Sequence, residues 1–300
     1  MNESLLKFIA KIFRNTPHFK GKYRIGKVLQ KILNPSSKWK QSEFFIQLKN
    51  KSILYIDINS NIHNIPFWTG LRDEKIINLI LKNVSMDWVV LDIGANIGNY
   101  SIPIAKKLHP LNGKIHAFEP VIENYKSLEK AVIKNDVSDN IVLNKYALGD
   151  FDGTINIVKT QPGKSSNAVL SFNDKEYEKG LSTETINIVK LDNYINNVTR
   201  CDFIKVDIEG AEYFMIKGGM KFIEKFKPII YGEFNAYFLQ KFGFSILDVW
   251  NILEPMGYSA YVEDETKKGT FIKTTMKIGL ENLLYLPPHI KNISEWNIKK

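Results

Sequence analysis

Short apolar runs alternate with stretches of helical periodicity over most of the chain. Strand-like apolar runs lie at 88–93, 115–118, 141–146, 203–206, 229–231 and 258–262. Apolar residues at helical spacing occupy 100–108, 121–135, 211–226 and 246–256. Such alternation predicts βαβ units, and the near-continuous apolar strands predict a parallel sheet that is buried on both faces. The pattern therefore places the chain in the α/β class.

The pattern changes before this region and between its two halves. Residues 44–48 and 53–58 form two strand-like runs around a short polar segment, which predicts a β-hairpin. Residues 72–83 place apolar side chains behind a charged first turn, which suits a helix leading into the main domain. Between the halves, 153–189 is rich in strand-like runs. The predicted divisions are a helical and β-hairpin extension at 1–70, a main domain at 71–265, and a C-terminal tail packed on that domain at 266–300.

The composition is that of an ordinary globular protein. Of the 300 residues, 44% are hydrophobic and 24% are charged, which suits one sizeable domain with a small appendage. Cys201 is the only cysteine, so the chain forms no internal disulfide and no Cys-based zinc site. No apolar run approaches the roughly 18 residues of a membrane-spanning helix, and the N-terminus lacks the apolar centre of a signal peptide. A cytoplasmic location is therefore expected.

The chain carries a formal charge of +9, which favours an anionic partner. Its lysines are scattered rather than gathered in a dense basic block, so nucleic acid is not expected as a partner. One segment combines charge and apolar side chains, because 4–14 has apolar residues at helical spacing opposite Lys7, Lys11 and Arg14. We interpret it as a helix half-buried on the main domain. Weak peripheral contact with an anionic membrane surface, at the inner face, is the alternative.

The segment around Asp92 has the pattern of a nucleoside-binding site. A buried strand ends at Asp92, a loop of small residues including Gly94 and Ala95 follows, and then a helix begins. Such a loop presents backbone N–H groups and the positive end of a helix to the crevice above the strands. Gly94 and Gly98 allow a ligand to approach closely, and Asp92 is placed to meet a ligand ammonium directly or through water. A dinucleotide fingerprint requires glycine where this chain has Asn96, so a pyrophosphate site is disfavoured.

The ends of the next two strands supply further candidates for cofactor binding. Glu119 ends the second strand, twenty-one positions after Gly98, where an acid binds the ribose hydroxyls of a nucleoside. Ala147 and Leu148 follow the third strand, near the expected position of adenine. A structural turn without a ligand is the alternative for each segment alone. The shared register of the three segments favours a single cofactor site.

Four acidic residues gather where the following strands end. Asp207, Glu209 and Glu212 follow the fourth strand, and Glu233 ends the fifth. Crowded carboxylates raise one another's pKa, and a carboxylate with a raised pKa is suited to act as general base toward a hydroxyl. We predict catalytic roles for Asp207, Glu209 and Glu233, and acceptor binding for Glu212. The alternative is that Glu209 and Glu212 only stabilise a helix N-terminus.

Two further predictions concern a metal ion and a histidine. A divalent ion held by Asp207, Glu209 and Glu233 is compatible with the sequence. It is not expected, because carboxylate clusters also serve sugar recognition. His63 lies in a stretch that we interpret as a loop ahead of the main domain, positioned to contact the acceptor. A plain surface loop is the alternative for His63.

Taken in order, these segments resemble the FkbM family of methyltransferases. The segments that carry the resemblance are Val89 to Ser101, Phe118-Glu119-Pro120, Ala147-Leu148-Gly149, Leu191-Asp192, Ile204 to Glu212, Lys217-Gly218-Gly219 and Glu233. The similarity covers about 89 to 261. It implies a class I (Rossmann-like) methyltransferase fold, with a mostly parallel seven-stranded sheet and helices on both faces. The residues that it assigns to S-adenosyl-L-methionine are Asp92, Gly94, Asn96, Gly98 and Glu119.

The resemblance also implies a function, because members of the family commonly methylate hydroxyl groups. The prediction is S-adenosylmethionine-dependent O-methylation of a sugar, glycan or related small molecule. A nucleic-acid methyltransferase is disfavoured because no Asn-Pro-Pro-Tyr-like string follows the fourth strand and the acids there repel phosphates. A nicotinamide-dependent oxidoreductase is disfavoured by Asn96 and by the lack of a Tyr-x-x-x-Lys pair after that strand. A non-catalytic module that kept the nucleoside pocket is the remaining alternative.

Overall fold

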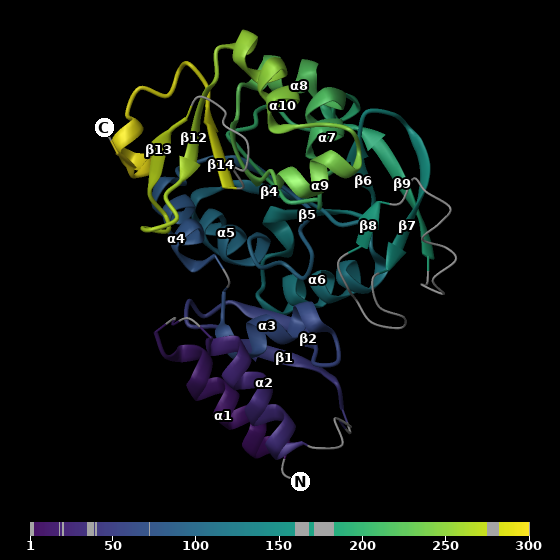
Figure 1. Cartoon of the computed structure of the whole chain (residues 1–300), viewed down its shortest axis with the longest axis vertical. Coiled ribbons are helices and arrows are strands. Elements are labelled where there is room, and N and C mark those ends of the chain that lie inside the picture. The colour runs from purple at the N-terminus through teal and green to yellow at the C-terminus, as the bar shows by residue number, and fades with distance from the viewer. Residues whose placement is uncertain are drawn as a thin grey trace.

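A nine-stranded sheet organises the main domain (Figure 1). The computed structural model describes residues 3–17, 19, 21–34, 39, 41–71, 73–159, 168–170, 183–274 and 282–299. The strands are β3 (Val89–Ile93), β4 (Lys114–Phe118), β5 (Ile141–Asn144), β10 (Phe203–Val206), β11 (Ile229–Glu233), β12 (Ser259–Glu263), β13 (Phe271–Lys273), β14 (Asn282–Leu286) and β15 (Ile298–Lys299). Their order in the sheet is β15-β13-β12-β14-β11-β10-β3-β4-β5.

The predicted α/β fold with a mostly parallel sheet is confirmed. Strands β5, β4, β3, β10 and β11 run parallel in that order, and β14 is antiparallel to both β11 and β12. Six of these seven strands overlap the apolar runs that predicted strands, whereas β14 lies in the predicted tail and was not among them. The short strands β13 and β15 extend the sheet beyond β12, so it has nine strands rather than seven.

Helices cover both faces of this sheet. On one face lie α4 (Glu74–Asn83), α5 (Ser101–Leu108) and α6 (Ile122–Lys134), and on the other lie α7 (Glu212–Gly218), α8 (Met220–Phe226), α9 (Ala236–Lys241) and α10 (Ile246–Leu253) (Figure 1). Within the described residues, short 3-10 turns lie at His109–Leu111, Ser138–Asn140, Leu191–Tyr194, Glu254–Met256 and Ile293–Trp296. Strand β3 is buried at every position, since Val90 packs into one core while Leu91 and Ile93 pack into the other. Burial on both faces explains why this strand is apolar throughout.

The helix predicted at 211–226 is two helices, α7 and α8, separated at Gly219. Close packing accounts for the glycines at this break. A Cβ atom at Gly218 would lie 1.8 Å from the carbonyl oxygen of Gly149, and one at Gly219 would lie 2.8 Å from the Leu191 side chain. The chain therefore ends one helix and starts the next where it presses against neighbouring backbone.

The C-terminal residues differ from the tail predicted at 266–300. Strand β14 lies inside the main sheet, between β11 and β12, and its residues Leu283 to Leu286 are buried. Because an antiparallel strand at this position pairs with neighbours on both sides, it is part of the domain core rather than a segment packed on it. The predicted boundary at 265 therefore divides the sheet.

A second, four-stranded sheet lies beside the main one. It contains β6 (Ala147–Gly149), β7 (Gly153–Lys159), β8 (Ala168–Leu170) and β9 (Thr183–Lys190), in the order β6-β9-β7-β8. The strand-like runs expected within 153–189 are confirmed where they fall on described residues. Residues 160–167 and 171–182 lie outside them.

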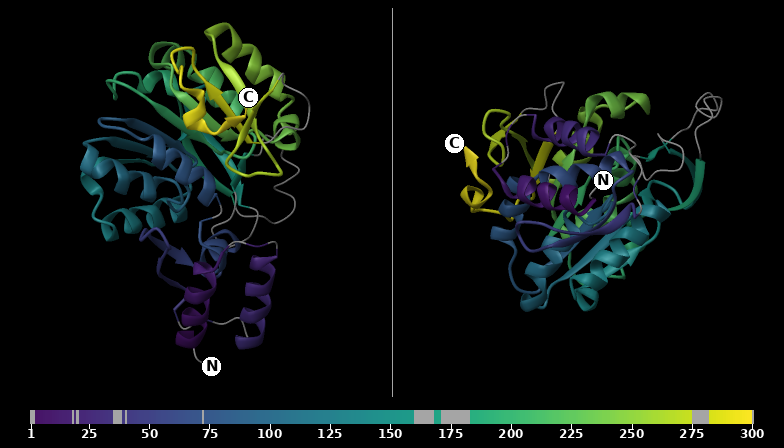
Figure 2. Two further views of the ribbon diagram at one scale, coloured as in Figure 1. Left: turned by 90° about the vertical axis from the view of Figure 1, so that its left-hand side faces the viewer. Right: turned by 90° about the horizontal axis from the view of Figure 1, so that it is seen from below.

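The N-terminal segment forms a separate layer at the lower end of the molecule (Figures 1 and 2). It contains α1 (Glu3–Asn15), α2 (Lys22–Leu33), β1 (Glu43–Gln47), β2 (Ile53–Asp57) and α3 (Asn61–Thr69). The predicted hairpin is confirmed, because β1 and β2 pair antiparallel. The Asn135 side chain at the end of α6 fixes it to the main domain by hydrogen bonds to the Ile53 N–H (2.9 Å) and carbonyl (2.6 Å). Among the described helices, none has the length and apolar character needed to cross a bilayer.

Candidate active site

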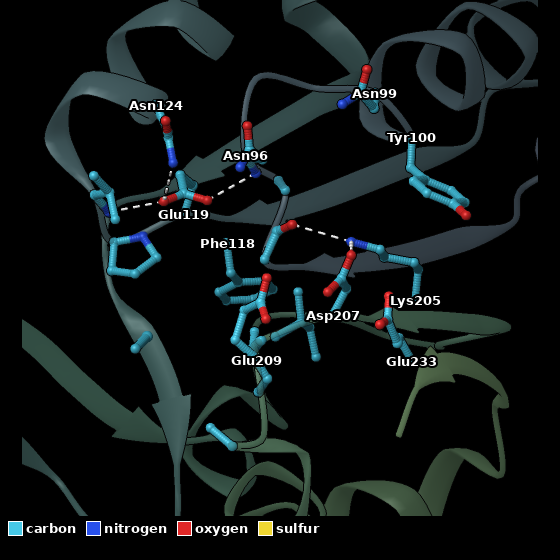
Figure 3. Close-up of a pocket in the computed structure, with 18 of the residues that line it drawn as sticks. Asn96, Asn99, Tyr100, Phe118, Glu119, Asn124, Lys205, Asp207, Glu209 and Glu233 are labelled. Atoms are coloured by element: carbon cyan, nitrogen blue, oxygen red, sulfur yellow. Dashed lines mark hydrogen bonds and ion pairs between the residues drawn. The ribbon is translucent and has the colours of Figure 1, made fainter. Parts of the chain in front are cut away.

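A cavity of about 390 Å³ opens above the carboxyl ends of β3, β4, β10 and β11 (Figure 3). We call it the first cavity. Strand β6 and the second sheet close one side of it, and α3 contributes Ile65 and Pro66. In open α/β sheets, ligands bind in the crevice outside these strand ends. The volume is within the range of small-molecule sites.

The loop after β3 is held against its neighbours by backbone contacts. The N–H groups of Gly94 and Ala95 donate to the Phe118 carbonyl at 3.0 and 2.9 Å. Gly94 has φ +78°, and a Cβ atom there would lie 2.0 Å from the carbonyl oxygen of Asp207. Only glycine satisfies both the left-handed backbone and this close approach. Gly94 and Ala95 line the first cavity, as predicted for a ligand-facing loop.

Asn96 and Gly98 have different roles in the same turn. Asn96 lines the cavity and has φ +51°, a left-handed conformation that Asn tolerates better than most residues. Its Oδ1 accepts from the Ile97 N–H at 2.9 Å. Gly98, with φ +93°, does not line the cavity, and a Cβ atom there would lie 2.7 Å from the Leu128 side chain. Gly98 thus lets α5 start close to α6 rather than contacting a ligand.

Glu119 lies at the end of β4 and faces the first cavity (Figure 3). Its carboxylate accepts from the backbone N–H groups of Asn96 (2.8 Å) and Val121 (2.9 Å) and from the Asn124 side chain (3.4 Å). Burial raises the pKa of Glu119 to about 7, and these hydrogen bonds oppose the rise. Two carboxylate oxygens offer about four acceptor positions, and these three hydrogen bonds leave about one position, on Oε2, for a ligand.

Asp92 does not line the cavity, so of the two contacts with a ligand ammonium that were predicted, direct or through water, the structure does not provide the direct one. Its side chain is fully buried, accepts from the Ser101 hydroxyl at 2.5 Å, and lies 3.5 Å from the Lys205 ammonium. A buried carboxylate needs a compensating charge, and Lys205 on the adjacent strand β10 supplies it. The lysine therefore occupies the place that we assigned to a ligand ammonium.

Lys205 contacts both the loop after β3 and the acids after β10. Its only signal in the sequence is a lysine within an apolar strand. Its ammonium donates to the Gly94 carbonyl at 3.1 Å, lies 3.8 Å from the Asp207 carboxylate, and sits 5.1 Å from the Tyr100 ring centre (Figure 3). Although burial lowers it, the pKa of Lys205 is raised by Asp92 and Asp207. Lys205 therefore stays charged.

Three of the four predicted acids reach the first cavity. Asp207, Glu209 and Glu233 line it, with Asp207 and Glu233 on the same side and Glu119 across from them (Figure 3). Glu209 has φ +54° in the turn between β10 and α7. No group of three or more acidic, His or Cys side chains in the described part of the chain has a metal-binding arrangement.

Glu212, predicted to bind the acceptor, does not line the cavity. It is fully buried, and its Oε1 accepts from the N–H groups of Ile208 (3.0 Å) and Gly210 (3.3 Å). Burial raises its pKa to about 7. The contacts hold the turn that carries Asp207 and Glu209, which agrees with the alternative of a helix-terminus role.

His63 also lies away from the cavity, and the predicted loop is wrong because it lies in helix α3. Its side chain is fully buried, with Nδ1 accepting from the Asp57 N–H at 3.1 Å and Nε2 3.4 Å from the Asn124 Oδ1. Burial lowers the pKa of His63 to about 4. Because Asn124 also donates to Glu119, two successive contacts through Asn124 connect His63 to the site.

The second sheet forms an apolar wall of the first cavity. Ala147 and Leu148 on β6 line it together with Ile157, Ile186 and Ile188. Ala147 and Leu148 were predicted from their position after the third strand, and the structure brings them to the cavity. The isoleucines come from strands far apart in sequence, which sequence reasoning did not connect to the site.

A second cavity, of about 520 Å³, adjoins the first. The residues that line both are Ile65, Asp73, Tyr100, Lys205, Asp207 and Glu233. The remaining wall includes Tyr23 and Arg24 at the start of α2, Lys268, and Asn282 of β14. Asp207 and Glu233 therefore lie at the boundary between the two cavities.

The fold and the site define a class of protein: an α/β domain with a ligand cavity at the strand ends, a glycine turn after the first parallel strand, and a buried acid after the second. Comparison with known families then identifies the particular family. The family described as the methyltransferase FkbM domain matches residues 92–260, and the chain belongs to it. The resemblance inferred from the motifs is confirmed.

Individual relatives are more distant. The chain is 28% identical to the methyltransferase sdnD of Sordaria araneosa over 165 residues, which are 46% of this chain and 62% of that protein. Among solved structures, FkbM methyltransferase of Methylobacillus flagellatus KT has 18% identity and a TM-score of 0.46, covering 68% of this chain and 44% of its own. The TYW2 protein of Pyrococcus horikoshii, in complex with MeSAdo, has 14% identity and a TM-score of 0.42, covering 88% and 81%. The chain thus spans less than two thirds of the first two of these relatives.

Proposed function

We propose that the protein transfers a methyl group from S-adenosylmethionine to a hydroxyl of a sugar, glycan or related small molecule. The cofactor occupies the first cavity and the acceptor occupies the second. The observation that carries this proposal is the boundary between them, where Asp207 and Glu233 line both cavities. A group transferred from one ligand to the other has to cross that boundary.

The residues of the first cavity fit the parts of this cofactor. Glu119 has acceptor capacity for a ribose hydroxyl, and the wall formed by Leu148 and Ile188 suits adenine. The turn at Gly94 leaves room for the amino-acid half next to exposed backbone. When bound, the cofactor supplies a methyl group activated by a sulfonium. Glu209, which lines only the first cavity, contributes negative charge beside this cation.

The side chains at the boundary position the acceptor. Asp207 is 44% exposed and lies 3.8 Å from the Lys205 ammonium, so it is suited to accept a hydrogen bond from an acceptor hydroxyl and to take its proton. Glu233 lies on the same side (Figure 3) and binds the acceptor at a second point. Alignment of the hydroxyl with the methyl group supplies most of the acceleration.

The second cavity suits a hydroxylated acceptor. Its wall combines the rings of Tyr23, Tyr100 and Tyr231 with hydrogen-bonding groups such as Asn282. Aromatic faces next to amide and carboxylate groups match the alternating apolar and hydroxylated surfaces of a sugar. Three acids line this cavity, Asp73, Asp207 and Glu233, together with four basic residues, Lys22, Arg24, Lys205 and Lys268, so its charge alone does not decide between a neutral and an anionic acceptor.

Titration calorimetry tests the cofactor half of the proposal. The purified protein is expected to bind S-adenosylhomocysteine and not NAD. NAD binding without S-adenosylhomocysteine binding would support an oxidoreductase instead. Binding of S-adenosylhomocysteine without transfer of labelled methyl to any sugar or nucleotide-sugar offered would favour a non-catalytic module.

Substitutions at the boundary test the acceptor half. Asp207→Asn is expected to lower kcat by about 10²- to 10⁴-fold while leaving S-adenosylhomocysteine affinity within about twofold, because general-base catalysis is worth that factor. Asp139→Asn is the matched control, because this carboxylate is exposed and lines neither cavity. Full turnover in both Asp207→Asn and Glu233→Gln would remove the proposed roles.

Retention of activity after exhaustive chelation would exclude a catalytic divalent metal.

A further inference from the structure

Helices α1 and α2 carry two matching rows of exposed apolar side chains. The rows are Leu5, Phe8 and Ile12 on α1, and Ile25, Val28 and Ile32 on α2. Both follow the spacing i, i+3, i+7, which places each row along one side of its helix. Exposure reaches 59% at Phe8 and 64% at Ile32. A soluble surface rarely exposes so many large apolar side chains in adjoining rows.

The opposite sides of the two helices pack on the rest of the molecule. Leu6 and Ala10 of α1 are fully buried. Gly26 of α2 lies against the Trp68 ring of α3, since a Cβ atom there would be 2.4 Å from it. The two helices lie side by side at the lower end of the molecule (Figure 2). Both apolar rows therefore point away from α3, and together they form one outer face.

A basic row accompanies each apolar row. The basic residues are Lys7 and Lys11 on α1, and Arg24, Lys27 and Lys31 on α2, each one position before an apolar residue of its row. Successive residues are about 100° apart around a helix, so the basic side chains flank the apolar rows. Lys7 turns toward the body of the protein, with its ammonium 3.9 Å from the centre of the Phe44 ring, so the basic residues beside the exposed rows are Lys11, Arg24, Lys27 and Lys31. Between residues 3 and 34, Glu3 is the only acidic residue, against eight Lys and Arg.

We infer that the outer face of α1 and α2 docks on an anionic lipid bilayer. Apolar side chains enter the boundary between headgroups and acyl chains, while the flanking lysines and arginines reach anionic headgroups. The nearly one-signed charge favours an anionic lipid surface over a second copy of the same basic face, which would repel it. The protein then lies on the membrane rather than crossing it.

This orientation has a consequence for the acceptor, which rests on the proposed function. Phe19, which is 41% exposed, and Arg24 both line the second cavity and adjoin the docking face. Docking therefore brings the second cavity to the headgroup region. An acceptor sugar carried on a lipid anchor would enter from the bilayer without leaving it.

Vesicle co-sedimentation of the full chain tests docking independently of catalysis. Binding is expected to vesicles of 70% phosphatidylcholine and 30% phosphatidylglycerol, and to be at least about tenfold weaker to pure phosphatidylcholine or in 0.5 M salt. The double variant Phe8→Asp, Val28→Asp is expected to lose at least about tenfold in vesicle affinity. Ile133→Asp, at an equally exposed apolar residue of α6 (69%), is the control and retains binding.

Two measurements separate the outcomes. S-adenosylhomocysteine affinity and the melting temperature of the double variant are expected to match those of the wild type, so a failure to fold or of the proposed cofactor site is detected separately. Equal binding to anionic and neutral vesicles, or no binding to either, overturns the inference. A wild-type dimer that the double variant converts to monomer, without vesicle binding, would instead assign the face to self-association.

Discussion

The two cavities that meet at Asp207 and Glu233 are built in different ways. The first is lined mainly by turns that directly follow β3, β4 and β10, inside the region that matches the family. The second takes much of its wall from α2, α3, Lys268 and β14, which lie outside that region. Cofactor binding thus depends on local backbone geometry, and acceptor binding depends on distant segments brought together by the fold. We expect substitutions in the first cavity to change cofactor affinity, and substitutions in the second to change only acceptor kinetics.

The largest effect is expected at Gly94. Gly94→Ala places a Cβ atom 2.0 Å from the Asp207 carbonyl in a residue with φ +78°. The turn has to move, and S-adenosylhomocysteine affinity is expected to fall by at least about 100-fold. Gly243→Ala is the matched control, since Gly243 has φ +80° but no atom within 4 Å of the added Cβ. Equal effects of the two variants on affinity would show that the close approach is unimportant.

Glu119 is expected to give the next largest effect, and the effect depends on pH. Glu119→Gln removes charge-assisted hydrogen bonds to the ribose, worth about 1.5–3 kcal/mol, so affinity for S-adenosylhomocysteine falls about 10- to 100-fold at pH 8. The ribose favours the ionised carboxylate, whose pKa without ligand is about 7. Wild-type affinity should therefore fall as the pH drops below 7, and this dependence should vanish in Glu119→Gln.

Glu212 provides the control for Glu119, because its pKa is also raised to about 7 but it does not line the first cavity. In the unliganded protein both residues bind a proton between pH 4.5 and 7 that the unfolded chain has released. Their contribution to stability therefore decreases as the pH rises through that range. Glu212→Gln should reduce this dependence of stability and leave the pH dependence of ligand affinity intact. If Glu212→Gln also abolished the pH dependence of ligand affinity, both glutamates would act on the cofactor.

A smaller effect is expected in the second cavity. Tyr23→Phe removes one hydrogen-bonding group from its wall, which is worth about 0.5–1.5 kcal/mol and so raises the acceptor KM about 2- to 10-fold. S-adenosylhomocysteine affinity should not change. Tyr55→Phe, at a hydroxyl that donates to Glu43 on the hairpin, is the control. A change in cofactor affinity caused by Tyr23→Phe would contradict the separation of the two cavities.

The contrast between local backbone geometry and distant segments also explains which features the sequence predicted. The alternation of apolar runs predicted the α/β sheet, and position after a strand predicted that Gly94, Asn96 and Glu119 face the cavity. These predictions depend on local rules: a strand end in a parallel sheet has one available crevice, and a turn conformation is set by the residues within it. Position after a strand was insufficient for Asp92 and Glu212, because burial and local partners turned both away from the cavity.

The remaining residues could not be predicted because their roles depend on partners far along the chain. Lys205 looks like a strand residue until Asp92, Gly94 and Asp207 are placed around it. Strand β14 joins the sheet through pairing with β11 and β12, which no local pattern specifies. The pairing of α1 with α2, which creates their outer face, is likewise a tertiary contact.

The smallest effect on the cofactor is expected at His63, which tests whether the contact between His63 and Asn124 influences the first cavity. His63 contacts Asn124, and Asn124 contacts Glu119, each at 3.4 Å. Since Asn124 lies between His63 and Glu119, His63→Gln is expected to weaken S-adenosylhomocysteine binding by about two- to threefold, a fraction of one hydrogen bond. His116→Gln is the control. Burial also lowers the pKa of His116 to about 4, but its Nδ1 pairs with the Tyr194 hydroxyl at 2.7 Å rather than with Asn124.

Both histidines are expected to make stability depend on pH in the same direction. Each has a pKa of about 4 when folded, against an ordinary pKa of 6.5 for histidine, so the unfolded chain binds protons that the folded state does not. Stability should be complete above pH 6.5 and decrease by up to about 3 kcal/mol per histidine as the pH falls to 4. Either substitution should remove part of this loss in chemical denaturation, but only His63→Gln should alter ligand affinity. If neither substitution alters ligand affinity, the contact between His63 and Asn124 has no influence on cofactor binding in the first cavity.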